Sequence, residues 1–300
     1  MKTYRLYQVD AFTTELFRGN PAGVVPDADG LTATQMQAMA REMNNSETAF
    51  MLSPTAADHD VWVRFFTPAT EVPSCGHATI AAHYVRALEL GLPSCRVVQK
   101  IGAGILPVDI IREEKDYRIV MTQGAIEFGA SFTGAQRNEI AAALGLASGD
   151  LDLRCPVQIV STGHSKVLIG IRERTVLNQL QPDVARLTAI SRRIKCNGYF
   201  VFVLAPDSGE VLSHGRMFAP AIGIPEDPVT GNANGPLGAY LVRHRLVPTG
   251  GSRLVFKGQQ GEAIGRLGTV EVEVEIEEDR PTMVKVGGRA VIVFRTELTV

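Results

Sequence analysis

Four side chains of this sequence suit proton-transfer chemistry: Glu47, Cys75, His77 and Asp227. Glu47 stands in a polar stretch just before an apolar strand pattern, and Cys75 and His77 flank a glycine that opens a helical pattern. Asp227 precedes a proline in a turn. Carboxyl, thiol and imidazole groups are common general acids and bases in enzymes. These residue types therefore indicate an enzyme that moves protons.

The sequence around these residues occurs twice. Residues 64–85 and 216–242 share an arginine, a phenylalanine and two prolines at one constant offset, and a short insertion then brings Gly76 opposite Gly231. Each copy has the pattern of a strand, a tight turn and a helix N-terminus, whose free backbone N–H groups bind anions. Only two copies exist, which indicates a duplicated domain rather than a solenoid. We therefore expect an anion-binding site that is built twice.

The two copies differ in their ionisable groups. The counterparts, first copy before second, are Cys75 and Thr230, His77 and Asn232, and Glu47 and Asn197. The third pair comes from aligning residues 46–50 with residues 196–200. A symmetric scaffold with unsymmetrical ionisable groups predicts an enzyme that binds a small carboxylate. The residues expected to bind that carboxylate are Gly76, Gly231, Asn232 and Ala233, with Cys75, Asn20 and the loop 162–165 as further candidates.

Length and composition limit the class of protein. A chain of 300 residues favours two domains of about 150 residues each. A net charge of −2 offers no basic face for nucleic acid and no polybasic patch for a membrane. No apolar run is long enough for a transmembrane helix, and residues 1–10 have a strand pattern rather than that of a signal peptide. The four cysteines show no C-x-x-C spacing, so we expect a reduced cytoplasmic protein.

The elements that must position these residues can also be predicted. Residues 78–90 are alanine-rich and almost uncharged, which is typical of a helix buried on all sides. Residues 235–244 predict a second such helix, with Pro236 in its first turn. Residues 31–43 predict an amphipathic helix with Thr32 as its N-cap. The domains expected are residues 1–118 with 288–300, and residues 119–287.

Six motifs together resemble one known family. They are residues 10–13 (DAFT), 17–25 (FRGNPAGVV), 45–50 (NSETAF), 64–68 (RFFTP), 75–79 (CGHAT) and 226–233 (EDPVTGNA). In this order they are similar to the PhzF-like family of phenazine-biosynthesis proteins, within the diaminopimelate epimerase and proline racemase superfamily. The resemblance implies an α+β fold of two pseudo-symmetric domains, each a barrel-like sheet around a central helix, with the active site between them. It also implies a homodimer and no cofactor. The histidines show no metal-ligand spacing such as H-E-x-x-H, so no metal is expected.

The resemblance also implies roles for individual residues. The family's acid/base glutamate falls on Glu47, its histidine on His77 and its aspartate on Asp227. In the epimerase branch two cysteines act from opposite faces of the substrate, whereas here only Cys75 is present and Thr230 occupies the second position. A threonine hydroxyl is too weakly acidic to replace a thiol as an acid/base near pH 7. Two-cysteine racemisation is therefore not expected.

Three functions remain open at this point. The first is a cofactor-independent isomerase of a small carboxylate, in which Glu47 takes a proton from carbon and returns it elsewhere. The second is a one-cysteine epimerase or dehydratase that uses Cys75, because a helix N-terminus favours the thiolate. The third is a carboxylate-binding or scaffold protein without catalysis. The sequence does not name the substrate.

Overall fold

The computed structural model describes residues 1–205 and 209–300 and divides the chain into two compact units. The N-terminal unit contains Met1–Thr122 and Gly287–Val300, and the C-terminal unit contains Gln123–Val286. The expected boundaries were at 118/119 and 287/288. Sheets and helices occur in both units, so the predicted α+β class is confirmed. No helix of the described residues is long and apolar enough to cross a membrane.

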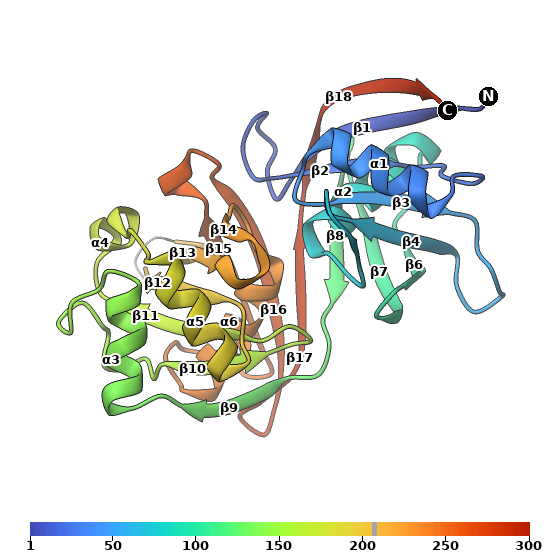
Figure 1. Cartoon of the computed structure of the whole chain (residues 1–300). Coiled ribbons are helices and arrows are strands. Elements are labelled where there is room, and N and C mark those ends of the chain that lie inside the picture. Colours follow the sequence, from blue (N-terminus) through green and yellow to red (C-terminus); the bar gives the residue numbers. More distant parts are fainter. Residues whose placement is uncertain (206–208) are drawn as a thin grey trace. The chain divides into compact units, whose positions relative to one another are not determined.

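The N-terminal unit is a mixed sheet with two helices (Figure 1). Its strands are β1 (Thr3–Ala11), β2 (Asn20–Val25), β3 (Thr48–Leu52), β4 (Val61–Phe66), β5 (Glu71–Val72), β6 (Cys95–Ile101), β7 (Gly104–Glu113), β8 (Asp116–Thr122) and β18 (Ala290–Thr299). Hydrogen bonding gives the order β18-β1-β2-β3-β4-β6-β7-β8, with β5 paired to β4. Only β2–β3 and β4–β6 are parallel among these pairs. The helices are α1 (Ala33–Met43) and α2 (Gly76–Leu90).

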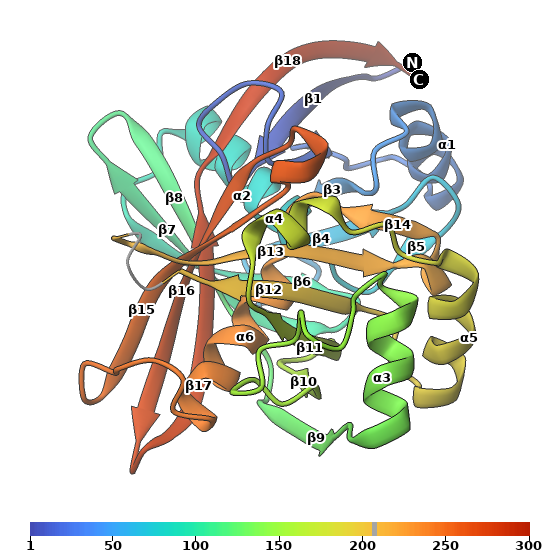
Figure 2. The same ribbon diagram turned by 90° about the vertical axis from the view of Figure 1, so that its left-hand side faces the viewer.

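Helix α2 is the buried centre of this unit. It packs against β1, β2, β3, β7, β8 and β18, and Figure 2 shows it among these strands. Ala78, Ile80, Ala81 and Ala82 are fully buried, as the alanine-rich pattern predicts. The helix begins at Gly76, two residues before the expected start, and ends at a left-handed Gly91. Small side chains let the strands approach the helix closely. Burial on every side explains why the helix carries almost no charged residues.

Helix α1 covers the opposite face of the same strands. Its N-cap is Thr32, whose hydroxyl accepts a hydrogen bond from the Gln35 backbone in a complete capping box. The predicted start is therefore confirmed. Met36 and Met39 of this helix pack with Phe50 in one apolar cluster. The sheet thus has α2 on its inner face and α1 on its outer face.

The C-terminal unit repeats this arrangement with more helices. Its strands are β9 (Glu127–Ser131), β10 (Gln158–Ser161), β11 (Lys166–Ile171), β12 (Tyr199–Leu204), β13 (Val211–Ala219), β14 (Ile224–Asp227), β15 (Arg253–Gln260), β16 (Gly268–Glu277) and β17 (Arg280–Gly288), the last of which crosses the unit boundary. Hydrogen bonding gives the order β9-β10-β11-β12-β13-β15-β16, with β14 paired to β13. Here β11–β12 and β13–β15 are parallel, at the same places in the order as in the first unit. The helices are α3 (Gly134–Ala143), α4 (Arg174–Gln179), α5 (Val184–Ile194), α6 (Gly231–Arg243) and the short 3₁₀ turns Pro220–Ile222 and Glu262–Ile264.

Helix α6 is the buried centre of the second unit and packs against β10, β11, β15 and β16. It begins at Gly231, four residues before the expected start at 235. The prediction that Pro236 lies in the first turn is therefore wrong, because Pro236 is the sixth residue of the helix. Proline has no N–H group, so the carbonyl of Asn232 lacks its usual helical donor. The Gln123 side-chain amide donates to the carbonyl of Gly231, the residue before Asn232, at 3.3 Å.

Strand register shows which residues of the two units correspond. Phe50 lies opposite Arg64, and Val201 lies opposite the matching Arg216. Phe50 packs against the outer helix α1, and Val201 belongs to the cluster that packs with α3 and α5. Phe50 therefore corresponds to Val201. Its alignment with Phe200 was wrong by one residue, and a shift of one residue turns every side chain of a strand to the other face.

The same register corrects the counterpart of Glu47. The Glu47 carbonyl accepts a hydrogen bond from Gly23 at 3.2 Å, and the Gly198 carbonyl accepts the equivalent bond from Val167 at 2.8 Å. The counterpart of Glu47 is therefore Gly198, and the prediction of Asn197 is wrong. The second unit has no side chain at the position where the first unit has a carboxylate.

His83 makes the stability of the fold depend on pH. It is fully buried on α2, and its Nε2 lies 3.0 Å from Gln99 Oε1. Burial lowers the pKa of His83 from 6.5 to about 4. Between these values the unfolded chain binds a proton that the folded chain does not, so stability is full above pH 6.5 and falls as the pH drops. The loss at pH 4 is about 3 kcal/mol.

This loss can be assigned to His83 by substitution. We expect urea unfolding of His83→Gln to give a free energy that depends less on pH between 4 and 6.5 than that of the wild type. Glutamine cannot take up the proton, whereas the other titrating groups are common to both proteins. Equal slopes in the two proteins would contradict the assignment.

Candidate functional site

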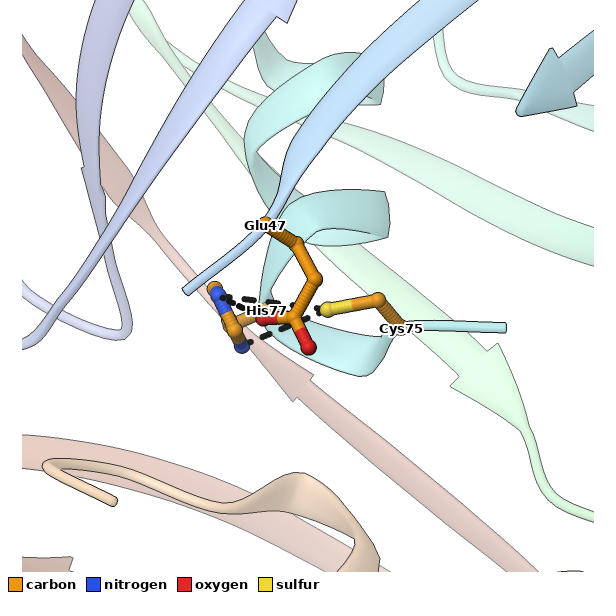
Figure 3. A group of neighbouring side chains, drawn as sticks. All are labelled: Glu47, Cys75 and His77. Carbon is orange, nitrogen blue, oxygen red and sulfur yellow. Dashed lines mark hydrogen bonds and ion pairs between the residues drawn. The ribbon is translucent and has the colours of Figure 1, made fainter. Parts of the chain in front are cut away.

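Glu47 and His77 meet in the N-terminal unit (Figure 3). His77 Nε2 lies 3.3 Å from Glu47 Oε2, and the two side chains are 8% and 13% exposed. The Ser46 hydroxyl lies 3.2 Å from the same imidazole nitrogen. The structure thus brings together two residues for which the sequence predicted a role in catalysis. Ser46 was not predicted, although it directly precedes Glu47.

Cys75 lies close to both nitrogens of the imidazole, with its Sγ 3.9 Å from His77 Nε2. Its Sγ is 3.5 Å from His77 Nδ1, and the cysteine is buried. Cys75 is the N-cap residue of α2 but makes no capping hydrogen bond with its side chain. Its backbone carbonyl accepts a hydrogen bond from the Thr79 hydroxyl at 2.7 Å. The thiol therefore points to His77 rather than to the helix backbone, as Figure 3 shows.

Local structure explains why these three side chains converge. Glu47 is the last residue before β3, which holds its backbone against β2. Cys75 and His77 stand on either side of Gly76, where α2 begins. Since Glu47 lies on the inner face of the sheet, its side chain reaches the N-terminus of the central helix. The duplicated pattern of strand, turn and helix thus gives the site its position.

The Glu47 carboxylate is incompletely paired. Its Oε2 is buried and accepts no hydrogen bond from any residue that the structure describes, although it is in ion-pair contact with His77. Buried polar atoms are nearly always hydrogen-bonded, and an unpaired one in a native protein often marks a site of function. This oxygen is free to accept a proton or a hydrogen bond from a ligand.

Glu47, Cys75 and His77 also have the chemistry of metal ligands. One donor atom from each lies within 4.8 Å of the other two, and among the described residues they form the one such group of three. Carboxylate oxygen, thiolate and imidazole nitrogen are all ligands of zinc. The same three groups can also pass protons to one another through the imidazole.

In the C-terminal unit the corresponding place holds Asp227 and Thr230. The Thr230 hydroxyl donates a short hydrogen bond to Asp227 Oδ2, and Thr230 is the N-cap residue of α6. Gln260 links both, since its side chain donates to the Asp227 carbonyl at 2.7 Å and to Thr230 Oγ1 at 3.0 Å. Its Oε1 accepts from the Thr230 backbone at 3.1 Å. Asp227 is thus fixed beside the helix N-terminus. The contacts of Gln260 had no signal in the sequence.

Most of the remaining candidates lie at or next to the same two helix ends. Gly76 and Gly231 are the first residues of α2 and α6, and Asn232 and Ala233 follow in the first turn of α6. The loop 162–165 joins this group through Gln123, which accepts from the Thr162 hydroxyl at 2.7 Å and donates to Asn232 Oδ1 at 2.9 Å. Asn20 is fully buried at the start of β2. Gln123 was missed because it lies far from every motif in the sequence.

The chain is similar to known proteins over nearly its whole length. Residues 9–296 match the family model PhzC-PhzF, described as phenazine biosynthesis-like protein. An uncharacterized isomerase of Clostridium acetobutylicum is 57% identical over 298 residues, which cover 99% of each chain. Trans-2,3-dihydro-3-hydroxyanthranilate isomerase of Pseudomonas aeruginosa is 32% identical over 287 residues and 95% of each chain. The crystal structure of a PhzF-family protein of Bacillus anthracis covers 100% of both chains with a TM-score of 0.87 and 33% identity.

The family match spans nearly the whole chain. The two relatives are named isomerases, and the similarity covers nearly their full length. Two of the six motifs, residues 75–79 and 226–233, build the two helix ends, and Glu47, His77 and Asp227 all lie within the motifs. The chain therefore belongs to the phenazine biosynthesis-like (PhzC-PhzF) family, and it is an isomerase.

Proposed function

We propose that this isomerase shifts a proton within a small carboxylate and that Glu47 is its acid/base. Glu47 removes a proton from a carbon of the substrate, and the same carboxyl group returns it to another atom of the conjugated system. One C–H bond breaks, one new bond to hydrogen forms, and the electron pairs move within the substrate, so no oxidant or reductant takes part. The reaction needs no cofactor.

The observation that carries this proposal is the buried Glu47 Oε2 without a hydrogen-bond donor among the described residues. A base must have a lone pair free for the substrate proton, and it must be within reach of that proton. His77 lies at 3.3 Å on one side and orients the carboxyl group. As an N–H donor, His77 also stabilises negative charge that develops on the substrate.

We propose a complementary role for the C-terminal unit. The backbone N–H groups of Gly231 and Asn232 bind the substrate carboxylate, because a helix N-terminus attracts anions. Ala233, which the sequence also suggested, does not take part through its backbone, because its N–H already donates to the Thr230 carbonyl at 3.1 Å. Asp227 orients the substrate from its fixed place beside Thr230. The proposal requires Glu47 and Asp227 to act on one substrate, in a protein that works as a homodimer.

Cys75 supports a second candidate, a one-cysteine epimerase or dehydratase. Its Sγ lies 3.5 Å from His77 Nδ1, and an imidazole at this distance can take the thiol proton. Thr230 replaces a second cysteine, so the thiol would need Glu47 or Asp227 as its partner. The two candidates differ in which group exchanges its proton with the substrate carbon.

Solvent exchange tests the proposal. The protein is incubated in D₂O with a panel of small unsaturated carboxylic acids that includes trans-2,3-dihydro-3-hydroxyanthranilate, and deuterium uptake is followed by NMR. We expect one or more members to take up deuterium at carbon and to rearrange. Saturable binding without exchange across the panel would favour a protein that binds but does not catalyse. Loss of exchange on treatment with a chelator, with recovery on adding zinc, would assign the Glu47, Cys75 and His77 group to a metal.

A further inference from the structure

Lys166 stands in the C-terminal unit where the N-terminal unit has a small residue. Register pairs Gly23 with Thr48 and Val167 with Tyr199, so Lys166 corresponds to Ala22. Ala22 is fully buried, whereas Lys166 is partly exposed. At the start of β11, a long positively charged side chain thus stands where β2 of the first unit has a methyl group.

The neighbouring strand shows the opposite change. Glu47, which precedes β3, corresponds to Gly198, which precedes β12. An added Cβ at Gly198 would lie 2.3 Å from Lys166 Cδ and 2.8 Å from its Cε. The lysine stem therefore fills the space that a side chain at position 198 would need. The first unit has alanine beside glutamate, and the second has lysine beside glycine.

This exchange places a positive charge where the first unit has a negative one. Within the described residues, the Lys166 ammonium has one hydrogen bond, to the adjacent Ser165 carbonyl at 3.3 Å, and no carboxylate within ion-pair distance. Burial lowers the pKa of Lys166, and the charges of Cys196 and Asp227 oppose that effect. An ammonium group has three N–H donors, so donors remain for another partner.

A structural role explains these features less well. A lysine that only filled space over Gly198 would gain nothing from its charge, because an uncharged side chain of the same length would fill that space equally well. The strand alternation places Lys166 on the face of the sheet that carries α6, together with Leu168. The stem of Lys166 crosses Gly198, the counterpart of Glu47, and Glu47 reaches the N-terminus of the central helix in the first unit. Lys166 therefore belongs to the same end of α6 as the proposed carboxylate site.

We propose that Lys166 is a substrate-binding residue that contacts a carboxylate group of the substrate, and that Gly198 is glycine so that the lysine can lie across it. This inference rests on the proposed function, because it assigns a further residue to the same reaction. Lys166 thus favours anionic ligands over neutral analogues of the same shape.

Kinetics of substituted proteins test the assignment with any compound that the exchange screen identifies. Lys166→Met is expected to raise KM about 10- to 100-fold, the effect of losing one charged hydrogen bond, with a smaller change in kcat. Lys166→Arg keeps the charge and should lose less. Gly198→Ala keeps the lysine but displaces its stem, and should raise KM in the same direction. Lys257→Met removes an equal charge from an exposed ion pair with Glu210 and should leave KM unchanged.

If no compound in the screen reacts, the proposed function fails, and ligand binding then tests the role of Lys166 independently. The probes are benzoate and its neutral isostere benzamide, each titrated in ligand-observed NMR. We expect the wild type to prefer benzoate and Lys166→Met to lose that preference while its Tm stays at or above the wild-type value. Equal binding of both probes to the wild type, or a preference that survives in Lys166→Met, would overturn the assignment. So would an unchanged KM, or a lowered Tm with unchanged binding, since either would mark a purely structural lysine.

Discussion

Glu47→Gln is expected to abolish exchange of substrate protons with solvent while substrate still binds. Glutamine keeps the shape of glutamate and can still contact His77, but its amide cannot take a proton from carbon. Removal of a general acid/base costs about 10²- to 10⁴-fold in rate, which separates this effect from a small defect in binding. The measurement is deuterium uptake in D₂O, with binding followed in parallel by titration of the same compound.

Cys75→Ala is the matched control for this experiment. The thiol contacts the same imidazole at 3.5 Å, but it does not cap the helix, so alanine should leave α2 intact. We expect a much smaller loss of rate than in Glu47→Gln. If Cys75→Ala were inactive while Glu47→Gln still exchanged protons, the thiol would be the base and the one-cysteine mechanism would replace the one proposed here.

The sequence predicted the helix ends better than the strand positions. Glycine and the capping threonine are local signals, and they marked Gly76, Gly231 and Thr32 because each acts on its own backbone, although the ranges expected for the two central helices began at 78 and 235. The match of Phe50 with Phe200 was made by residue type. It failed because both faces of these strands are apolar, so the pattern itself does not show which face a residue takes. Only the hydrogen-bond register settled that Gly198 is the counterpart of Glu47.

Polar partners brought in from distant segments were not predictable either. Gln260 lies on β15 and Gln123 precedes β9, and neither stands near a motif in the sequence. Each becomes significant only when the chain folds and places it at the N-terminus of α6. Such residues have no local pattern of hydrophobicity, glycine or proline to mark them.

Arg216→Met is expected to destabilise the fold strongly, by about 3–5 kcal/mol. Arg216 binds Glu226 through two hydrogen bonds, of 2.9 and 2.7 Å, and the two side chains are only 8% and 13% exposed. The guanidinium also donates to the carbonyls of Leu177 and Leu180, both at 3.0 Å. Methionine would leave a buried carboxylate and two carbonyl groups without their donor. The measurement is urea unfolding followed by far-UV circular dichroism.

The duplication supplies the control, since Arg64 occupies the equivalent position in the N-terminal unit. Arg64 binds Glu71 with the same geometry, at 2.7 Å for both contacts, but the Glu71 side chain is 44% exposed. Water can solvate that carboxylate when the arginine is removed, so Arg64→Met should cost about 1 kcal/mol or less. Because an unpaired buried charge causes most of the larger loss, adding Glu226→Gln to Arg216→Met should restore part of the stability. Equal losses for the two arginines would show that burial does not set the strength of these pairs, and that the two units tolerate the loss of the repeated arginine alike.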